Sequence, residues 1–191
     1  MVFQDKSRDY NHAPLFSKRA PDNDTFTRDI CDTCGFIDYV NPKVVTGVVA
    51  LWEGQILMCR RDIEPRKGFW TLPAGFMEQL ETTQQGAARE AKEEACADVD
   101  IGPLLAIYNV ERISQVQIFY RGDLRSPDIA AGDETIEVAL LDWEEIPWAE
   151  LAFPSVYWAL KYFAETREMK NFPPAPQPED WMATPGFNYT G

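Results

Sequence analysis

Three glutamates, Glu90, Glu93 and Glu94, lie close enough along the chain to form one group of carboxylates. In a helix, their i, i+3 and i+4 spacing places them on one side, with Cβ atoms about 5–6 Å apart. Carboxylates this close repel one another, and a bound cation would reverse that effect. Hard divalent ions such as Mg²⁺ and Mn²⁺ prefer oxygen ligands, so the spacing predicts a metal site. The alternative is a solvated helix without chemistry, because these residue types have high helix propensity.

The residues around the glutamates favour a helix that could carry them. Thr82 and Gln85 have the Thr-x-x-Gln spacing of a capping box, which predicts that the helix begins at about Thr83. The apolar side of this helix consists of small residues, Ala88, Ala91 and Ala95. Small side chains would let the helix backbone lie close to a sheet.

A longer pattern surrounds the glutamates. Arg89 is placed to contact Glu93 one helical turn on, and its rigid guanidinium could also hold Glu81 from the preceding loop. The whole pattern is Gly75-x5-Glu81-x7-Arg89-Glu90-Ala91-x-Glu93-Glu94-x-Cys96-Ala97. It resembles the Nudix box, G-x5-E-x7-R-E-U-x-E-E-x-G-U, in which U is a bulky aliphatic residue. Every charged position and the first glycine match. The departures are Cys96 at the second glycine and Ala91 and Ala97 at aliphatic positions.

The resemblance extends beyond the box, over roughly residues 31–163. Further segments look like a group of Nudix pyrophosphatases that act on ADP-ribose and FAD: Arg60-Arg61, Gly68 to Phe76, Glu134-x-x-Glu137 and Glu145-Ile146-Pro147. This resemblance implies an α/β fold, the Nudix α/β/α sandwich around a mixed β-sheet, with a small N-terminal appendage. It also implies Mg²⁺ or Mn²⁺ as cofactor and a small-molecule nucleotide as substrate. Dimers are common among ADP-ribose-cleaving relatives, so it further implies a homodimer.

The resemblance also implies roles for the residues of the box. Glu90, Glu93 and Glu94 would hold the metal, helped by the backbone carbonyl at Gly75 or a neighbour. Arg89, together with Glu81, would orient these ligands rather than contact the substrate. Bound ions would neutralise the diphosphate and lower the pKa of a water molecule, which attacks one phosphorus and releases a nucleoside monophosphate.

A general base outside the helix is expected among the acidic residues of a glycine-containing loop. Asp133, Glu134 and Glu137 are the candidates, and we favour Glu137 over Glu134. The alternative is an acidic surface loop without a catalytic role, because charged loop residues are mostly only solvated.

Arginines and aromatic residues before and after the box could contact the substrate. Candidate phosphate and base contacts are Arg60, Arg61, Arg66, Phe69, Trp70, Phe76, Tyr108 and Phe119. For at least one of the arginines we prefer simple surface charge. The aromatic residues on strands are more often core residues than stacking platforms, because aromatic side chains favour half-buried sheet surfaces.

Composition excludes several classes of protein. Eighteen Lys and Arg against 31 Asp and Glu give a formal charge of −13, which argues against a nucleic-acid-binding protein. The longest mostly apolar run, Val44–Trp52, has nine residues, whereas a membrane-spanning helix needs about twenty. No basic segment followed by an apolar stretch opens the chain, so we expect no signal peptide, no membrane partner and a cytoplasmic protein.

We expect three parts: an N-terminal arm over 1–41, a hydrolase domain over 42–169, and a tail over 170–191 rich in proline and aromatic residues. Residues 1–28 have no run long enough for a core element. Strands are predicted at 44–52, 55–61, 69–72, 104–110, 116–124 and 136–143, and a second helix at 154–167. The tail is expected to be extended and could dock through Trp181, Phe187 and Tyr189.

The cysteines contribute one further hypothesis. Cys31-x2-Cys34 is half a zinc site, and the resembled group often carries an N-terminal zinc ribbon. Where an earlier cysteine pair would lie, this chain offers Asp9 and His12, its only histidine. Such a mixed ligand set is chemically possible, but we expect a decayed ribbon without zinc. Two other cysteines, Cys59 and Cys96, are expected to pack in the core.

The sequence therefore predicts a metal-dependent hydrolase of the pyrophosphate bond in a nucleoside diphosphate derivative, with ADP-ribose or FAD as substrate and AMP as product. Two alternatives stay open within the fold: hydrolysis of dNTPs or RNA 5′ ends, and a non-catalytic module that senses a nucleotide. A zinc-ribbon protein that handles nucleic acid is a third, against which the acidic charge argues.

Overall fold

The computed structural model describes residues 15–187, which divide into two compact units at the boundary between Asn41 and Pro42. The first unit is a three-stranded antiparallel sheet in the order β1-β2-β3, formed by β1 (Phe16–Arg19), β2 (Arg28–Cys31) and β3 (Ile37–Asp38). The small N-terminal appendage that we expected is therefore a folded sheet, but its strands β1 and β2, which begin within residues 1–28, were not predicted. The strands are too short for hydrophobic periodicity to reveal them.

Polar cross-strand contacts hold this small sheet together in place of an apolar core. Lys18 lies opposite Asp29 in the register and forms an ion pair with it at 3.6 Å. Arg19 pairs with Asp32 at 2.6 Å. Ile30 and Cys31 are its buried apolar residues. The strands of this sheet are short and rich in charged residues, a composition that is also typical of solvated loops.

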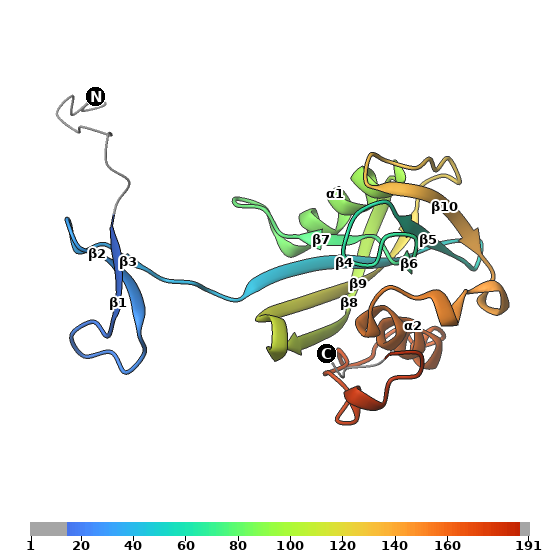
Figure 1. Ribbon diagram of the computed structural model, residues 1–191. Helices are drawn as coiled ribbons and strands as arrows, with labels where there is room; N and C mark the ends of the chain where they lie inside the picture. Colours follow the sequence, from blue (N-terminus) through green and yellow to red (C-terminus); the bar gives the residue numbers. More distant parts are fainter. Residues whose placement is uncertain (1–14, 188–191) are drawn as a thin grey trace. The chain divides into compact units, whose positions relative to one another are not determined.

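The second unit is built on a seven-stranded mixed sheet (Figure 1). Its main path runs β10-β5-β4-β9-β8, with β6 paired to β5 and β7 paired to β4. The β4–β9 pairing is parallel and the others are antiparallel. The strands are β4 (Lys43–Trp52), β5 (Gln55–Arg61), β6 (Trp70–Thr71), β7 (Ala74–Phe76), β8 (Val99–Val110), β9 (Gln115–Leu124) and β10 (Thr135–Leu141).

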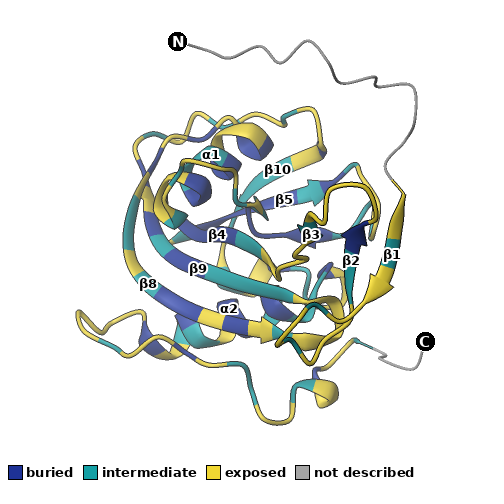
Figure 2. Cartoon of the chain, turned by 90° about the vertical axis from the view of Figure 1, so that its left-hand side faces the viewer, coloured by how far each residue is buried: buried dark blue, intermediate teal, exposed yellow. Residues whose placement is uncertain are grey.

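Two helices cover opposite faces of this sheet, as Figure 1 shows, so the expected α/β/α sandwich is confirmed. The helices are α1 (Thr83–Ala95) and α2 (Pro154–Thr166). Short 3-10 turns lie at η1 (Glu111–Ile113), η2 (Trp143–Glu145), η3 (Trp148–Glu150) and η4 (Trp181–Ala183). Because side chains alternate along a strand, Val48 and Ala50 of β4 pack toward α1, whereas Val49 packs toward α2. Figure 2 shows the buried residues concentrated along the central strands.

Small residues of α1 bring it close to the sheet, but not all of those predicted. Ala91 and Ala95 are completely buried in the core on this side of the sheet, together with Ala87, whereas Ala88, which we placed on the apolar side, is only half-buried. The face toward α2 is filled by larger side chains such as Leu160 and Phe163. The sandwich is therefore thin on the side that carries the glutamates and thick on the other.

Some strand boundaries differ from the prediction. Strand β8 begins at Val99 rather than at 104, because it continues through register shifts between Ile101 and Ala106, next to Pro103. Proline lacks the N–H that a regular ladder needs, so the sequence there resembles a strand boundary. The three-residue strand β7 was not predicted.

The C-terminal segment packs on the second unit. Ala175 forms backbone hydrogen bonds on both sides, donating to Leu105 O at 2.9 Å and accepting from Ile107 N at 3.0 Å. The indole N–H of Trp158 donates to Thr184 Oγ1 at 2.7 Å. Trp181 and Phe187 pack against the core on the α2 side, and Tyr189 lies outside the described residues. No helix among residues 15–187 is long and apolar enough to cross a membrane.

Candidate active site

The amino-terminal cap of α1 has the geometry that the sequence predicts. Thr82 Oγ1 accepts a hydrogen bond from the backbone N–H of Gln85, and the Gln85 side chain accepts one from the backbone N–H of Thr82. The helix therefore begins at Thr83 as expected. At the other end, Cys96 adopts the left-handed conformation, with φ 51°, in which helices usually place glycine. Cys96 is exposed, so our prediction that it packs in the core was wrong, whereas Cys59 is buried.

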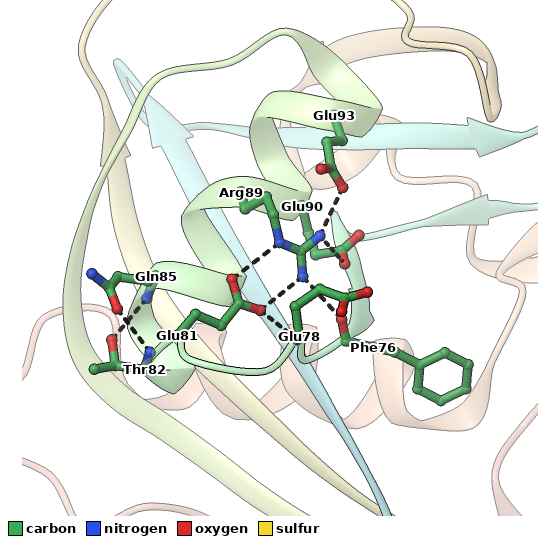
Figure 3. Close-up of polar contacts among 8 residues, drawn as sticks. All are labelled: Phe76, Glu78, Glu81, Thr82, Gln85, Arg89, Glu90 and Glu93. Carbon is green, nitrogen blue, oxygen red and sulfur yellow. Dashed lines mark hydrogen bonds and ion pairs between the residues drawn. The ribbon is translucent and has the colours of Figure 1, made fainter. Parts of the chain in front are cut away.

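Arg89 is the centre of the polar network on α1 (Figure 3). Its Nε and Nη2 donate to the two carboxylate oxygens of Glu81 at 3.1 and 2.9 Å, and Nη2 also donates to the Phe76 carbonyl at 2.9 Å. Its Nη1 donates to Glu90 at 2.8 Å and to Glu93 at 2.7 Å. The predicted contacts of Arg89 with Glu81 and Glu93 are thus present. One guanidinium fixes the loop before the helix and two glutamates at once.

Glu81 is the loop anchor of this network. Besides Arg89, it accepts a hydrogen bond from the backbone N–H of Glu78 at 2.7 Å. The hydrogen bonds from Arg89 lower the pKa of the Glu81 carboxyl below its usual value, and the Glu78 N–H adds to this effect. Glu81 is therefore a permanent anion that positions Arg89.

Burial separates the three glutamates into two kinds. Glu90 and Glu94 are buried, each 8% exposed, whereas Glu93 is exposed. Burial raises the pKa of Glu94 to about 8, and the charge of Glu90 adds to this rise. The pKa of Glu90 is also raised by burial, against the opposing effect of Arg89. A cation next to these two carboxyl groups would offset the cost of ionising both of them, so their burial favours cation binding.

Two glycines let other segments approach these glutamates closely. A Cβ at Gly75 would lie 2.3 Å from Glu90 Oε2, so β7 passes directly against the Glu90 carboxylate. A Cβ at Gly132 would lie 1.7 Å from the backbone oxygen of Glu93. The loop before β10 is thereby held at the end of α1, where Gly132 N donates to Glu94 O at 3.1 Å. The sequence analysis noted the glycine of this loop but did not predict that Gly132 packs against the end of α1.

This loop brings Glu134 toward the helix. The charge of Glu134 contributes to the raised pKa of both Glu90 and Glu94. Glu137 instead lies on β10 and pairs with Arg60, with Nη1 and Oε2 3.5 Å apart. Of the two candidate bases, Glu134 is therefore the one whose charge acts on the glutamates of α1, although we ranked it second.

The arginines upstream of the box have different surroundings. Arg61 is buried, donates from Nε to Pro65 O at 3.0 Å and stacks on Phe153 at 5.0 Å. It lies near enough to lower the pKa of Glu94. Arg60 donates to Gly68 O at 2.8 Å. Both residues lie at the end of β5, but only Arg61 is shown to act on a glutamate of α1.

Most of the candidate stacking residues belong to the core. Tyr108 is completely buried, Phe119 is 2% exposed and Trp70 is 9% exposed, all packed on the α2 side of the sheet. Our assignment of Trp70 to substrate binding is therefore corrected, because its ring fills the interior. Phe76 is half exposed beside the site and carries Lys43 Nζ over its ring at 4.8 Å.

The donor set fits a hard divalent cation. The residues that would hold it offer carboxylate oxygens, and the backbone at Gly75 runs against one of them. Across residues 15–187, no three acidic, cysteine or histidine side chains already converge as a metal site, because Arg89 holds Glu90 and Glu93. Glu93, which is exposed, would exchange this ion pair for the metal.

Cys31 and Cys34 lie at the turn that joins β2 to β3, and both are free thiols. Hydrogen bonds from Cys34 and Thr33 lower the pKa of the Cys31 thiol. Within the part of the chain that the structure describes, no third ligand joins them. Asp9 and His12 lie outside the described residues, so the decayed ribbon without zinc stays a prediction.

In the metal-free protein, stability is expected to fall as pH rises from 4.5 to 8. Folding raises the pKa of Glu94 from 4.5 to about 8. Within this range the folded state keeps a proton that the unfolded state has lost, so raising the pH favours unfolding. Urea unfolding in EDTA at both ends of the range measures the effect.

Glu94→Gln should remove most of this slope, whereas Glu165→Gln, an exposed change on α2, should keep it. Equal stability of the wild-type protein at both pH values would contradict the burial argument.

Comparisons with known proteins agree with this geometry. The profile of the NUDIX domain matches residues 41–165. An ADP-ribose pyrophosphatase from Methanocaldococcus jannaschii is 30% identical over 119 residues, covering 60% of this chain and 69% of that protein. The crystal structure of a NUDIX hydrolase from Nitrosomonas europaea is 42% identical with a TM-score of 0.82, covering 87% of this chain and 95% of that one.

An ADP-ribose pyrophosphatase from Streptococcus suis shares the fold, with a TM-score of 0.61 and 20% identity. It covers 71% of this chain and 99% of that one.

Proposed function

Because this chain belongs to the Nudix family and is a Nudix hydrolase, we propose that it cleaves the pyrophosphate bond of ADP-ribose. The products would be AMP and ribose 5-phosphate. Enzymes of this family bind nucleotide substrates and typically use a divalent metal. The observation that carries the general reaction is the group of three glutamates on α1, in which Glu90 and Glu94 are buried and Glu93 is exposed.

The choice of ADP-ribose depends on different support. The relative from Methanocaldococcus jannaschii is named ADP-ribose pyrophosphatase and is 30% identical over 119 residues. The net charge of −13 disfavours a long polyanion such as RNA but tolerates two phosphates beside a metal. FAD is the second candidate, because it shares the AMP half and the pyrophosphate.

Glu90, Glu93 and Glu94 would hold Mg²⁺ or Mn²⁺ in this proposal, with the carbonyl of Gly75 or a neighbour. Bound there, the metal supplies positive charge to the diphosphate and lowers the pKa of a water molecule. Arg89 keeps Glu90 in place, and Glu81 keeps Arg89 in place. The chain thus holds its ligands through a guanidinium that need not touch the substrate.

A carboxylate outside the helix would accept the proton from the attacking water. We now favour Glu134 over Glu137, because Glu134 acts on the charge state of Glu90 and Glu94. Glu137 is engaged by Arg60, and this ion pair would position Arg60 for the substrate phosphates.

A substrate panel tests the proposal. Released monophosphate is measured with Mg²⁺ and with Mn²⁺ for ADP-ribose, FAD, NADH, nucleotide sugars, dNTPs and triphosphorylated RNA. We expect the highest kcat/KM for ADP-ribose, with AMP as product, and loss of turnover in EDTA.

A higher kcat/KM for 8-oxo-dGTP or for RNA than for every dinucleotide would refute the substrate assignment and leave the metal chemistry standing. Absence of turnover on the whole panel would instead favour the nucleotide-sensing alternative.

A further inference from the structure

A cavity of about 500 Å³ lies on the α2 side of the sheet, beside the β4–β5 hairpin. Its walls include Gly54 of the hairpin, Gly102 of β8, Trp143 of η2 and Phe163 of α2. Arg61 and the site described above lie at the other end of β5. The volume is within the range of small-molecule sites in proteins. This cavity is therefore separate from the glutamates of α1.

A charged residue occupies a core-facing position at this cavity. Along β9, Tyr120 faces α1, where its hydroxyl contacts Thr83 Oγ1 at 2.6 Å. The residues on either side, Phe119 and Arg121, face α2 because strand side chains alternate. The guanidinium of Arg121 lies over the rings of Phe163 at 5.2 Å and Phe172 at 4.0 Å. Arg121 thus places a positive charge at a position where the alternation along the strand predicts an apolar side chain.

Arg121 has no acidic partner among the described residues. Its Nη2 donates to Thr166 Oγ1, and its buried Nε has no hydrogen-bond acceptor. Burial lowers its pKa below the usual value for arginine. Polar groups withdrawn from water are normally hydrogen-bonded, because otherwise they lose their hydration without compensation. Arg121 as a whole is half-buried, but its Nε is shielded from water and has no acceptor, which an anion in the cavity would supply.

Further cations line the same cavity. Arg167 and Lys170, just beyond α2, are exposed at its rim. The carboxylates at the cavity are Asp123 and Glu168, both exposed, and Glu168 lies 3.5 Å from Arg167. Three cations thus meet two carboxylates here, in a chain whose net charge is −13. The local excess of positive charge is opposite in sign to the rest of the molecule.

We propose that this cavity binds a small oxyanion, the phosphomonoester or carboxylate group of a metabolite, with Arg121 as its central contact. Guanidinium groups bind both anions through paired N–H donors. Arg167 and Lys170 add charge at the entrance. Trp143 offers an aromatic wall for the remainder of the ligand.

Isothermal titration calorimetry of the full chain with inorganic phosphate, and separately with succinate, tests the proposal at constant ionic strength. EDTA is present, so that no metal at the α1 glutamates can recruit the anion. We expect one site per chain. The better-bound probe tells whether the natural ligand carries a phosphate or a carboxylate.

Arg121→Met should abolish binding, and the exposed double change Arg167→Ala/Lys170→Ala should weaken it at least about tenfold. The double variant also keeps the test valid if Arg121→Met does not fold. Arg112→Ala is the matched control, since it removes one exposed cation at η1, the other end of the β8–β9 hairpin. No binding by the wild-type protein, or equal binding by the double variant and the control, would overturn the proposal.

Discussion

Replacing Glu93 by glutamine is expected to lower kcat by about 10²–10³-fold while the protein stays folded. Glu93 is exposed and accepts a hydrogen bond from Arg89, which a glutamine oxygen can also accept. What the variant loses is a negative oxygen for the metal. A group needed mainly in the transition state lowers kcat and kcat/KM together, so steady-state kinetics with ADP-ribose and Mg²⁺ measures the effect.

Glu111→Gln serves as the control for this experiment, because it removes an exposed carboxylate at η1, away from the helix. Unfolding by heat should be nearly the same in both variants and the wild-type protein. Turnover of Glu93→Gln within a factor of two or so of the control would remove this residue from the metal site.

Placing a methyl group on Gly75 is expected to have the second largest effect. The new Cβ would lie 2.3 Å from Glu90 Oε2, and Glu90 is buried and held by Arg89. The carboxylate must therefore move or β7 must shift. Overpacking of this kind typically costs about 1–3 kcal/mol of stability, and a displaced ligand lowers metal affinity. We expect Gly75→Ala to require much more Mg²⁺ for half-maximal rate.

The double variant Gly75→Ala/Glu90→Asp separates the two consequences. The shorter aspartate makes room for the new methyl group, so thermal stability should recover relative to Gly75→Ala alone. Activity should not recover, because the ligand is then too short to reach the metal. Full activity of Gly75→Ala would show that the close approach of β7 to Glu90 does not matter for catalysis.

Local interactions explain which parts of the site could be predicted from the sequence. The capping box, the helix boundaries and the contact of Arg89 with Glu93 all join residues within about one helical turn. Their spacing therefore specifies their geometry. The Glu81–Arg89 pair bridges only the loop before the helix, and the known box pattern predicted it.

Contacts between distant segments could not be predicted in the same way. Whether Trp70 or Phe119 faces the core depends on strand register, which one sequence does not specify. The position of Glu134 depends on the loop that Gly132 holds against α1. The N-terminal sheet was missed because charge pairs, not apolar periodicity, join its strands. The sequence could not rank Glu134 above Glu137 as the base, because the positions of both depend on contacts between distant segments.

The parallel pairing of β4 with β9 has a consequence for how the enzyme is made. Every glutamate of the α1 cluster has been synthesised before the first residue of β9, Gln115. Until then β4, which positions β7 and hence Gly75, lacks its central neighbour. Pairing between distant segments forms late, because closing the intervening loop costs entropy. The catalytic centre is therefore among the last features to form. A nascent chain that already contains all the metal-binding glutamates is expected to be inactive. An assay of residues 1–114 would check this.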